Sequence, residues 1–166
     1  IAALHRQLTV LEQQIAHLRL VKNRLVHRCA QMEKVQDFQN SKQEPTVKEI
    51  EQKYLLYAAV DTPYSPREIS IATKKCFSQA SKDELPIYFQ TGDIVPYEHI
   101  LQERYTEATV AFLPIEKTTK AKNIRRLPKG KVACIYHYGA YNSIECSYRK
   151  LLKFCEEHDF EIVSDS

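Results

Sequence analysis

The sequence predicts an α+β protein in which a long N-terminal helix precedes a duplicated β-α-β-β antiparallel sheet domain with two helices on one face. Three observations lead to this prediction. Residues 1–38 contain no Gly or Pro and carry apolar residues at heptad spacing. Residues 49–166 alternate strand-like and helix-like segments. The order of these segments then repeats, which is typical of an internal duplication.

The first segment, residues 1–38, has a continuous apolar seam. Its members follow steps of four and three, with one skipped position at Lys22: Leu4, Leu8, Leu11, Ile15, Leu18, Leu25, Cys29 and Met32. A helix of this length extends for roughly 57 Å at about 1.5 Å per residue, which is too long for the following domain to cover. We therefore expect a homodimer through this helix. The alternative is a helix that folds back on its own domain.

A polar stretch with Pro45, residues 39–48, predicts a linker between this coiled-coil helix and the domain over residues 49–166. The triplet Ser65, Pro66 and Glu68 predicts a helix start, because Ser is a frequent N-cap, Pro fits the first helical position and Glu completes a capping box. Further predictions for this half are a strand at about 50–60, a helix end near Asp83, a strand at 87–90, a turn at 91–93 and a strand at 98–113.

The second half of the domain repeats this order. Residues 132–138 are rich in β-branched and aromatic side chains and predict a strand, which Gly139 ends. Asn142 with Glu145 three residues later predicts a helix N-cap. An apolar stripe at helical spacing follows: Ile144, Tyr148, Leu151, Leu152 and Cys155. Pro63-Tyr64 and Ala140-Tyr141 are then expected to occupy equivalent turns of the two halves.

The bulk composition excludes several classes. The chain is 43% hydrophobic and 27% charged, which is typical of a soluble globular protein, and it has no apolar run of the roughly 20 residues that a membrane span needs. Its five cysteines are scattered without a Cys-x-x-Cys pair. We expect reduced thiols that pack as small hydrophobes in the cytoplasm, with zinc binding or a redox switch as the alternatives. We predict no metal and no cofactor.

A basic segment, residues 117–131, holds seven Lys or Arg and no acidic residue. It could bind nucleic acid, but no aromatic side chain is interleaved for base stacking. The formal charge of the whole chain is only +3, which is not typical of a nucleic-acid-binding domain. We therefore favour a solvated connection between the two halves of the domain.

The heptad helix, the polar linker and the duplicated domain together resemble the C-terminal part of a MerR-family transcriptional regulator. The resemblance is to the multidrug-binding branch with a GyrI-like effector-binding domain. It is most specific from Leu127 to Ser166, where the run Pro-Lys-Gly-Lys-Val-Ala-Cys-Ile-Tyr-His-Tyr-Gly-Ala-Tyr begins at Pro128. The resemblance implies a dimer of paired long helices, and promoter DNA bound by a domain that is not in this chain. Because the chain begins at Ile1, we expect it to be a piece of a longer protein.

The resemblance also implies a pocket for small hydrophobic or cationic molecules, lined by aromatic rings and a buried glutamate. Matched by motif, the ligand-binding residues are Pro66, Ile69, Tyr88, Tyr105, Tyr138, Gly139, Tyr141 and Ile144. Tyr88 and Tyr105 are expected to project from central strands. Lys74 stands where a drug-binding relative has a pocket tyrosine, and the family's glutamate falls beyond Ser166. Each tyrosine taken alone is also explained as half-buried packing.

These residues favour a ligand-sensing, non-enzymatic regulator. One alternative is a GyrI-like small-molecule hydrolase, but the sequence has no Gly-x-Ser-x-Gly elbow and no Cys–His pair at a convincing spacing. His137 could act as a base near neutral pH, but it alternates with Tyr136 and Tyr138, so it faces away from a ligand that Tyr138 contacts. The other alternative is a non-enzymatic protein-interaction module, which needs no pocket.

Overall fold

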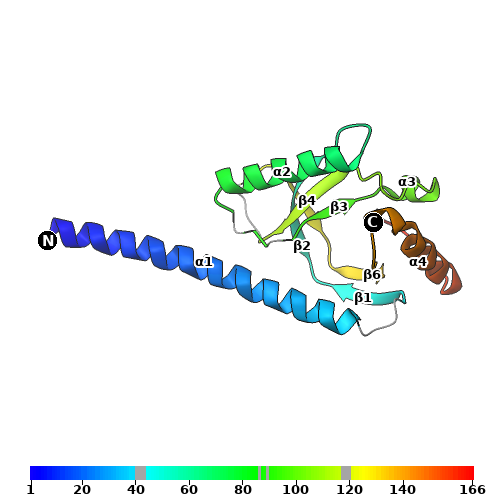
Figure 1. Ribbon diagram of the computed structural model, residues 1–166, viewed down its shortest axis with the longest axis horizontal. Helices are drawn as coiled ribbons and strands as arrows, with labels where there is room; N and C mark the ends of the chain where they lie inside the picture. Colours follow the sequence, from blue (N-terminus) through cyan, green and yellow to red (C-terminus); the bar gives the residue numbers. More distant parts are fainter. Residues whose placement is uncertain (40–43, 86, 89, 117–120) are drawn as a thin grey trace. The chain divides into compact units, whose positions relative to one another are not determined.

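The computed structural model describes residues 1–166 except 40–43, 86, 89 and 117–120 (Figure 1). It confirms the α+β class, with an N-terminal helix followed by antiparallel sheets and further helices. The chain divides into two compact units, residues 1–40 and residues 41–166, and each is described by itself.

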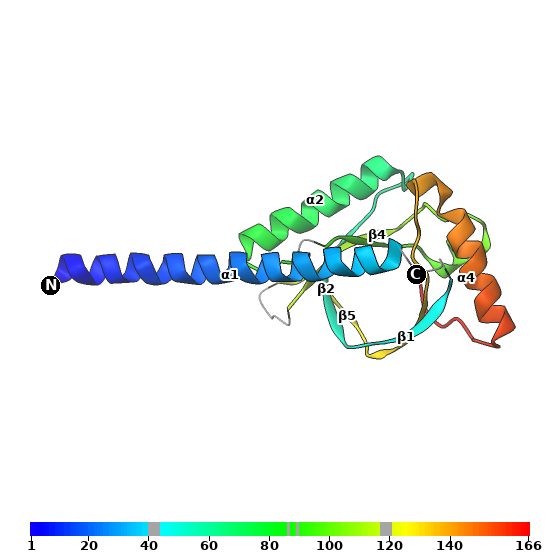
Figure 2. The ribbon, with the colours of Figure 1, turned by 60° about the horizontal axis from the view of Figure 1, so that its bottom comes forward.

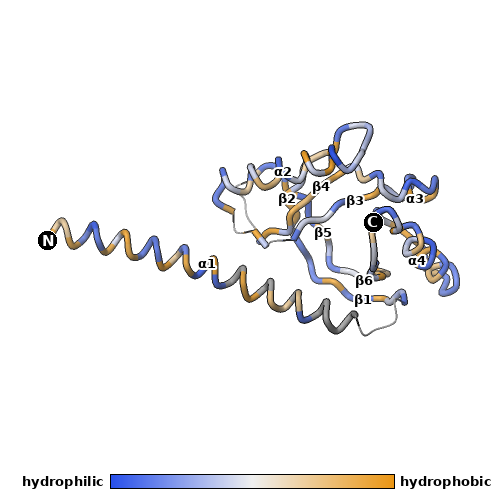
Figure 3. The backbone as a smooth tube through the Cα atoms, viewed as in Figure 1, coloured by the Kyte–Doolittle hydropathy of each residue, from blue (hydrophilic) through white to orange (hydrophobic). Residues whose placement is uncertain are grey.

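The first unit is α1 (Ala2–Gln39), a single helix of 38 residues. The absence of Gly and Pro allows it to run without a break. Apolar residues recur along it (Figure 3), and the predicted seam residues are exposed, from Ile15 at 49% to Leu4 at 67%. In the part of the chain that the structure describes, no helix is long and apolar enough to cross a membrane.

The second unit is organised around one antiparallel ladder that joins its two halves. β1 (Thr46–Ile50) pairs with β6 (Gly130–Cys134), and β2 (Lys53–Ala59) pairs with β5 (Ile124–Leu127). In every pair the two residue numbers add up to 180, so both pairings share one register. The ladder therefore consists of two long strands that are interrupted at the same level.

Two strand predictions need correction at this ladder. The strand expected at 50–60 starts at Thr46, inside the predicted linker, and is interrupted after Ile50. The register explains the interruption, because Pro128 lies at this level and has no N–H to donate. The strand expected at 132–138 ends at Cys134. The same register places Pro45 opposite the next residue, so the ladder loses a donor there as well.

A four-stranded sheet, in the order β3-β4-β2-β5, forms the rest of the domain. It contains β3 (Gly92–Ile94) and β4 (Val110–Ile115), and α2 (Pro66–Lys82) packs across β4 and β2 (Figures 1 and 2). Leu56 and Leu113 lie directly opposite each other on β2 and β4, and both are fully buried. Burial of two whole Leu side chains stabilises the sheet–helix layer by about 1.5–3 kcal/mol each.

The region between β3 and β4 differs most from the prediction. Residues 98–113 are not one strand: α3 (Tyr97–Leu101) opens this region and β4 begins only at Val110. Pro96 is the N-cap of this helix, and its carbonyl accepts hydrogen bonds from the backbone N–H groups of His99 and Ile100. Two residues of the turn expected at 91–93, Gly92 and Asp93, are instead in β3. Gly92 allows this, since a Cβ there would clash with the ring of Phe112 on β4.

The second helix start also differs in detail. A 3₁₀ turn, η1 (Tyr141–Ser143), precedes α4 (Glu145–Glu157), and the N-cap is Ile144. Asn142 is therefore not the cap, because it lies inside the 3₁₀ turn and makes no capping hydrogen bond. The earlier domain helix, α2, has Ser65 at its N-cap and Pro66 at its first position, as expected. However, the Ser65 hydroxyl donates to the Glu68 carboxylate instead of accepting from the backbone.

The two halves correspond residue by residue at a separation of 75 positions. Both helices end in the same way: Leu85 N–H donates to the Ala80 carbonyl, and Phe160 N–H donates to the Cys155 carbonyl, both at 2.9 Å. The residue before each donor has a positive φ, 52° at Glu84 and 53° at Asp159. When each residue of the ladder is replaced by its counterpart 75 positions away, the paired residue numbers still add up to 180. A pseudo-two-fold axis therefore relates the two halves, and it crosses the ladder between residues 52 and 53.

This correspondence moves the expected equivalence of the two turns by two residues. Tyr64, with φ 60°, corresponds to Gly139, with φ 134°, because both occupy the left-handed region before a helix start. Tyr141 therefore corresponds to Pro66 and not to Tyr64. The duplication is thus carried by backbone conformation, while the side chains at equivalent turn positions differ.

Candidate functional site

The residues around the two helix starts form an aromatic cluster over the first half of the sheet. Its centre is a stacked pair, Tyr105 and Tyr148, whose ring centroids are 5.2 Å apart with planes 18° from parallel. Tyr105 is buried, while Tyr148 is partly buried and its hydroxyl shares a 3.1 Å hydrogen bond with Ser166 Oγ. Tyr64 and Tyr97 pack against the same core cluster.

Each helix contributes one apolar residue beside this stack. Ile69 from the first turn of α2 is buried, and its counterpart Ile144, the N-cap of α4, packs against the same cluster. Each of these two residues belongs to the apolar stripe of its helix, and this stripe packs against the sheet. Ile69 and Ile144 therefore lie on the sides of their helices that face the sheet. The two helix starts therefore converge over one face of the sheet.

An acidic residue, Asp93, lies at the edge of this cluster. On β3 it pairs with Ala111 of β4, which in turn pairs with Ala58 of β2, so the three side chains share one face of the sheet. Ala111 is fully buried and both alanines belong to the core cluster, so this is the face that the helices cover. The side chain of Asp93 thus points into the aromatic cluster across two small residues.

The electrostatics of Asp93 fit this position. Burial raises the pKa of its carboxyl above the usual value of 3.8. Within the described residues the carboxylate has no hydrogen bond or ion pair. Burial also raises the pKa of the Tyr141 hydroxyl, and the nearby Asp93 charge and then Tyr148 raise it further. The site therefore combines a cluster of tyrosines with one carboxyl group that has no charge partner among the described residues.

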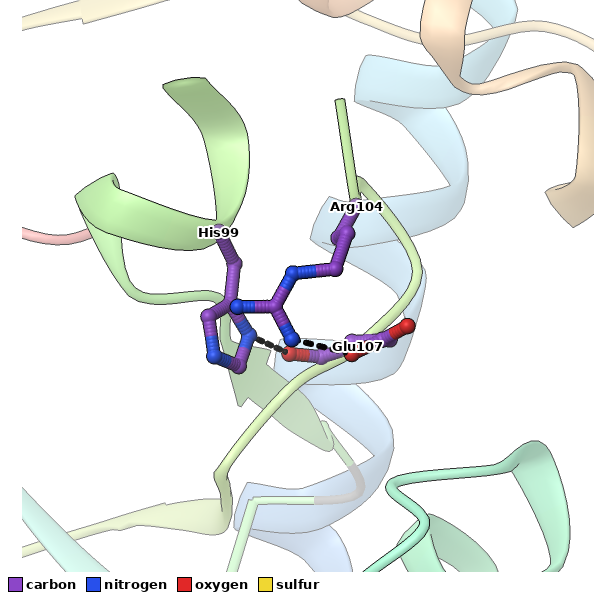
Figure 4. A network of polar contacts seen from close by, with 3 residues as sticks. All are labelled: His99, Arg104 and Glu107. Carbon is purple, nitrogen blue, oxygen red and sulfur yellow. Dashed lines mark hydrogen bonds and ion pairs between the residues drawn. The ribbon is translucent and has the colours of Figure 1, made fainter. Parts of the chain in front are cut away.

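A polar network positions Tyr105. His99 Nδ1 and the Glu107 carbonyl share a 2.8 Å hydrogen bond, and Arg104 Nη1 donates to the Glu107 carboxylate at 2.8 Å (Figure 4). The Arg104 backbone N–H also donates to the His99 carbonyl at 2.8 Å. These bonds close the loop between α3 and β4 on itself. Tyr105 belongs to this loop and not to a central strand, which corrects the prediction for it.

Positive charge near the stack is already neutralised. Arg149, the counterpart of Lys74, forms ion pairs with Glu145 at 2.7 Å and Glu103 at 3.1 Å. Glu145 raises the pKa of Arg149, and a hydrogen bond with Tyr105 contributes further. Lys74 itself is exposed on α2. The carboxyl of Asp93 thus has no cationic partner from either helix.

Several predicted ligand-binding residues lie outside this cluster. Tyr88 is not in a strand, and its hydroxyl donates to Glu116 at 3.2 Å; burial and then Glu116 raise its pKa. Tyr138 is 45% exposed. Pro66 and Gly139 are exposed at the two helix starts. Of the eight predicted residues, the structure brings Ile69, Tyr105 and Ile144 into the cluster and places Tyr141 beside it.

His137 has a different role from the one its strand alternation suggested. Its Nδ1 shares a 2.9 Å hydrogen bond with Oγ of Ser147, which is buried. Its Nε2 lies 3.1 Å from the Ala140 carbonyl oxygen and 3.2 Å from Ser143 Oγ. The imidazole therefore joins the end of β6 to the start of α4 and orients the turn that carries Tyr141.

Sequence reasoning missed Asp93 and Tyr148 as site residues. Asp93 was assigned to a turn, because the Gly92-Asp93 pair is a common turn signal. Tyr148 was assigned to the apolar stripe of α4. The helix period could have identified Tyr148, since it lies four residues after Ile144. No local signal identifies Asp93, because its orientation depends on pairing with a strand 18 residues away.

An open hollow with apolar lining lies along α1, where Leu18, Leu25 and Cys29 are among its residues, all from this one helix. Among the described residues, no group of three His, Cys, Asp or Glu side chains is placed to hold a metal ion. Comparison with protein-family models and with curated proteins finds no match to this chain.

Proposed function

We propose that this chain is the ligand-sensing portion of a transcriptional regulator, and that its domain binds hydrophobic organic cations at the aromatic cluster. The observation that carries the proposal is the Asp93 carboxyl group, which points into a tyrosine cluster and has no partner among the described residues. A partly buried carboxyl group without a partner is costly, and such groups often mark binding sites.

The chemistry of the cluster suits a cation with aromatic or alkyl substituents. Each tyrosine face attracts a cation by about 0.5–2 kcal/mol, depending on how well water is excluded. The Asp93 carboxylate supplies a full countercharge. Tyrosine hydroxyls both donate and accept hydrogen bonds, so the site can adapt to ligands of different shape. The preference should therefore follow charge and hydrophobic surface more than a single molecular outline.

The exposed seam of α1 supports the regulatory part of the proposal. Seven large apolar residues at heptad spacing are uncovered in the single chain, and such a seam is typical of a coiled coil. We propose that two copies pair through α1, and that DNA contact comes from a domain outside this chain. Among the described residues, all five cysteines are free thiols, which suits a cytoplasmic protein.

A direct test uses two probes of the same shape and opposite charge. Tetraphenylphosphonium is a cation and tetraphenylborate is its isosteric anion, so hydrophobic contact is matched and only the sign of the charge changes. We expect saturable binding of the cation by isothermal titration calorimetry, with the anion at least about tenfold weaker. Equal affinity for both ions, or no saturable binding of either, would contradict the proposal.

One observation favours a second candidate function, an ester hydrolase. Ser143 Oγ lies 3.2 Å from His137 Nε2, and Ser147 contacts the other ring nitrogen, an arrangement in which a base can activate a nucleophile. The Ser143 hydroxyl donates to the Ala140 carbonyl at 2.8 Å, and this carbonyl, 3.1 Å from Nε2, can only accept a hydrogen bond from the ring, so we place this candidate second. Turnover of p-nitrophenyl acetate that Ser143→Ala abolishes would support it.

A further inference from the structure

Two hydrogen-bonding groups from different halves of the domain lie near each other at the edge of the aromatic cluster. The Asp93 carboxyl group belongs to β3, and the Tyr141 hydroxyl belongs to η1. Burial raises the pKa of the Tyr141 hydroxyl, and the charge of Asp93 raises it further, so the two groups are close enough to interact. Within the described part of the chain, however, no hydrogen bond joins them. Both oxygens can therefore accept a hydrogen bond from a third group.

The position of Asp93 is fixed by the strands around it. β3 pairs with β4 over its whole length, and Asp93 itself lies opposite Ala111. Just beyond β3, Val95 and Ser166 exchange two backbone hydrogen bonds, of 2.7 and 3.1 Å. These bonds hold the backbone on both sides of Asp93, so only its short side chain can adjust.

The turn that carries Tyr141 is fixed independently. The Ile144 N–H donates to the Tyr141 carbonyl at 3.2 Å. The N–H and the hydroxyl of Ser143 both donate to the Ala140 carbonyl at 2.8 Å, and Nε2 of His137 lies 3.1 Å from the same oxygen. The separation between the carboxyl group and the hydroxyl is therefore set by the fold of both halves.

The neighbouring polar side chains do not supply a donor to Asp93. The Tyr148 hydroxyl shares its hydrogen bond with Ser166 Oγ at 3.1 Å, and Arg149 is already paired with two glutamates. In the free protein the hydrogen bonds of the Asp93 carboxylate therefore come from solvent. A bound cation takes this solvent away, and a cation without N–H groups returns no hydrogen bond to the carboxylate.

We propose that this site selects primary and secondary organic ammonium ions, which carry at least two N–H donors, over quaternary ammonium ions with the same hydrophobic body. The inference rests on the proposed cation site and adds the chemical class of its ligands. One N–H of the ligand donates to the Asp93 carboxylate and a second donates to the Tyr141 oxygen. The hydrophobic body contacts the rings of Tyr105 and Tyr148.

The test compares two probes that differ only at the nitrogen, 2-(1-naphthyl)ethylamine and its N,N,N-trimethyl derivative. Both carry one positive charge at pH 7, because a primary alkylamine titrates well above neutrality. The trimethyl probe has the larger apolar surface, so hydrophobic burial alone favours it. By isothermal titration calorimetry with the intact chain, we expect the primary ammonium ion to bind at least about fivefold more tightly.

One variant and a matched control assign this preference to the two acceptors. Tyr141→Phe keeps the ring and removes the hydroxyl, so it should reduce the preference to about twofold or less. Tyr138→Phe removes the hydroxyl of an exposed tyrosine that precedes the same turn and lies outside the cluster, so the preference should stay as in the wild type. The preference is a ratio of two Kd values for one sample, so it does not depend on the fraction of folded protein.

Tetraphenylphosphonium, titrated in parallel, separates the two levels of the argument. If it binds and the two naphthyl probes bind equally, or the trimethyl probe binds more tightly, the selection of N–H donors is overturned and the cation site stands. A preference that persists in Tyr141→Phe, or that is lost equally in Tyr138→Phe, also overturns it. If none of the three cations binds saturably, the proposed function is overturned as well.

Discussion

Replacing Asp93 with Asn tests the proposed cation site most directly. The substitution keeps the size of the side chain and removes its charge. In the structure this carboxyl group shares a sheet face with Ala111 and Ala58, and its charge acts on the Tyr141 hydroxyl. We expect Asp93→Asn to weaken binding of tetraphenylphosphonium and to leave binding of tetraphenylborate unchanged or slightly stronger.

The size of this effect follows from the surroundings of the carboxyl group. Tetraphenylphosphonium has no hydrogen-bond donor, so its attraction to the carboxylate is Coulombic, about 1.5–3 kcal/mol at separations of roughly 6–11 Å and an effective dielectric constant of about 20. At about 1.4 kcal/mol for each factor of ten, this corresponds to a Kd increase of roughly 10- to 150-fold. The rings of Tyr105 and Tyr148 remain in the variant, so some binding should persist.

The same substitution should raise the stability of the unbound protein at neutral pH. Burial raises the pKa of the Asp93 carboxyl in the folded state above its unfolded value of 3.8, so the folded state holds the proton more tightly. The stabilisation from this proton is therefore present below pH 3.8 and is lost as the pH rises through the folded-state pKa. Asp93→Asn should unfold at higher urea concentration than the wild type at pH 7, and the difference should shrink at acid pH.

Glu156→Gln is the matched control, because it removes one carboxylate from the exposed end of α4. It should change neither the Kd nor the pH dependence of unfolding. Both properties are measured on the same samples, by calorimetry and by urea titration. The reasoning is refuted if Asp93→Asn binds the cation as tightly as the wild type, or if it is less stable at pH 7.

Three further predictions concern the architecture. Leu11→Glu on the α1 seam should weaken dimerisation by at least about tenfold in sedimentation equilibrium, whereas Gln14→Glu should not; equal effects would argue against the seam. Leu113→Ala should lower the free energy of unfolding by about 3–5 kcal/mol, because its side chain is fully buried; a loss below about 1 kcal/mol would contradict the packing. Gly139→Ala should cost about 1–3 kcal/mol, because φ is 134° and the new Cβ would lie 3.1 Å from Ser143 Oγ; an unchanged urea midpoint would disprove the strained turn.

Local sequence patterns predicted the helices, whose formation depends mainly on neighbouring residues. The helix from Pro66 to Lys82 follows from a Ser-Pro start and an apolar stripe, and the long helix from the absence of breakers. The strands were predicted less well. Residues 98–113 have strand-like composition, but Pro96 and the ring of hydrogen bonds around Glu107 favour a short helix and a closed loop.

The residues of the candidate site were also predicted only in part. Tyr105, Ile69, Tyr141 and Ile144 were proposed by motif through the family resemblance, although Tyr105 was expected in a strand. Tyr88 and Tyr138 were proposed on the same grounds but lie outside the cluster. A tyrosine at a helix start or strand end has the same local sequence whether it faces the core or solvent, so only packing separates the two cases.

The sequence by itself determined the α+β class, the long seam of α1, the approximate positions of α2 and α4 and the existence of two similar halves. These features depend on the periodicity and the backbone preferences of neighbouring residues. Only the tertiary structure decided the pairing register of the ladder, the 75-residue correspondence and the position of Asp93 beside the tyrosine cluster. Each of these depends on register between strands far apart in the chain, and a shift of one residue would turn every side chain to the other face.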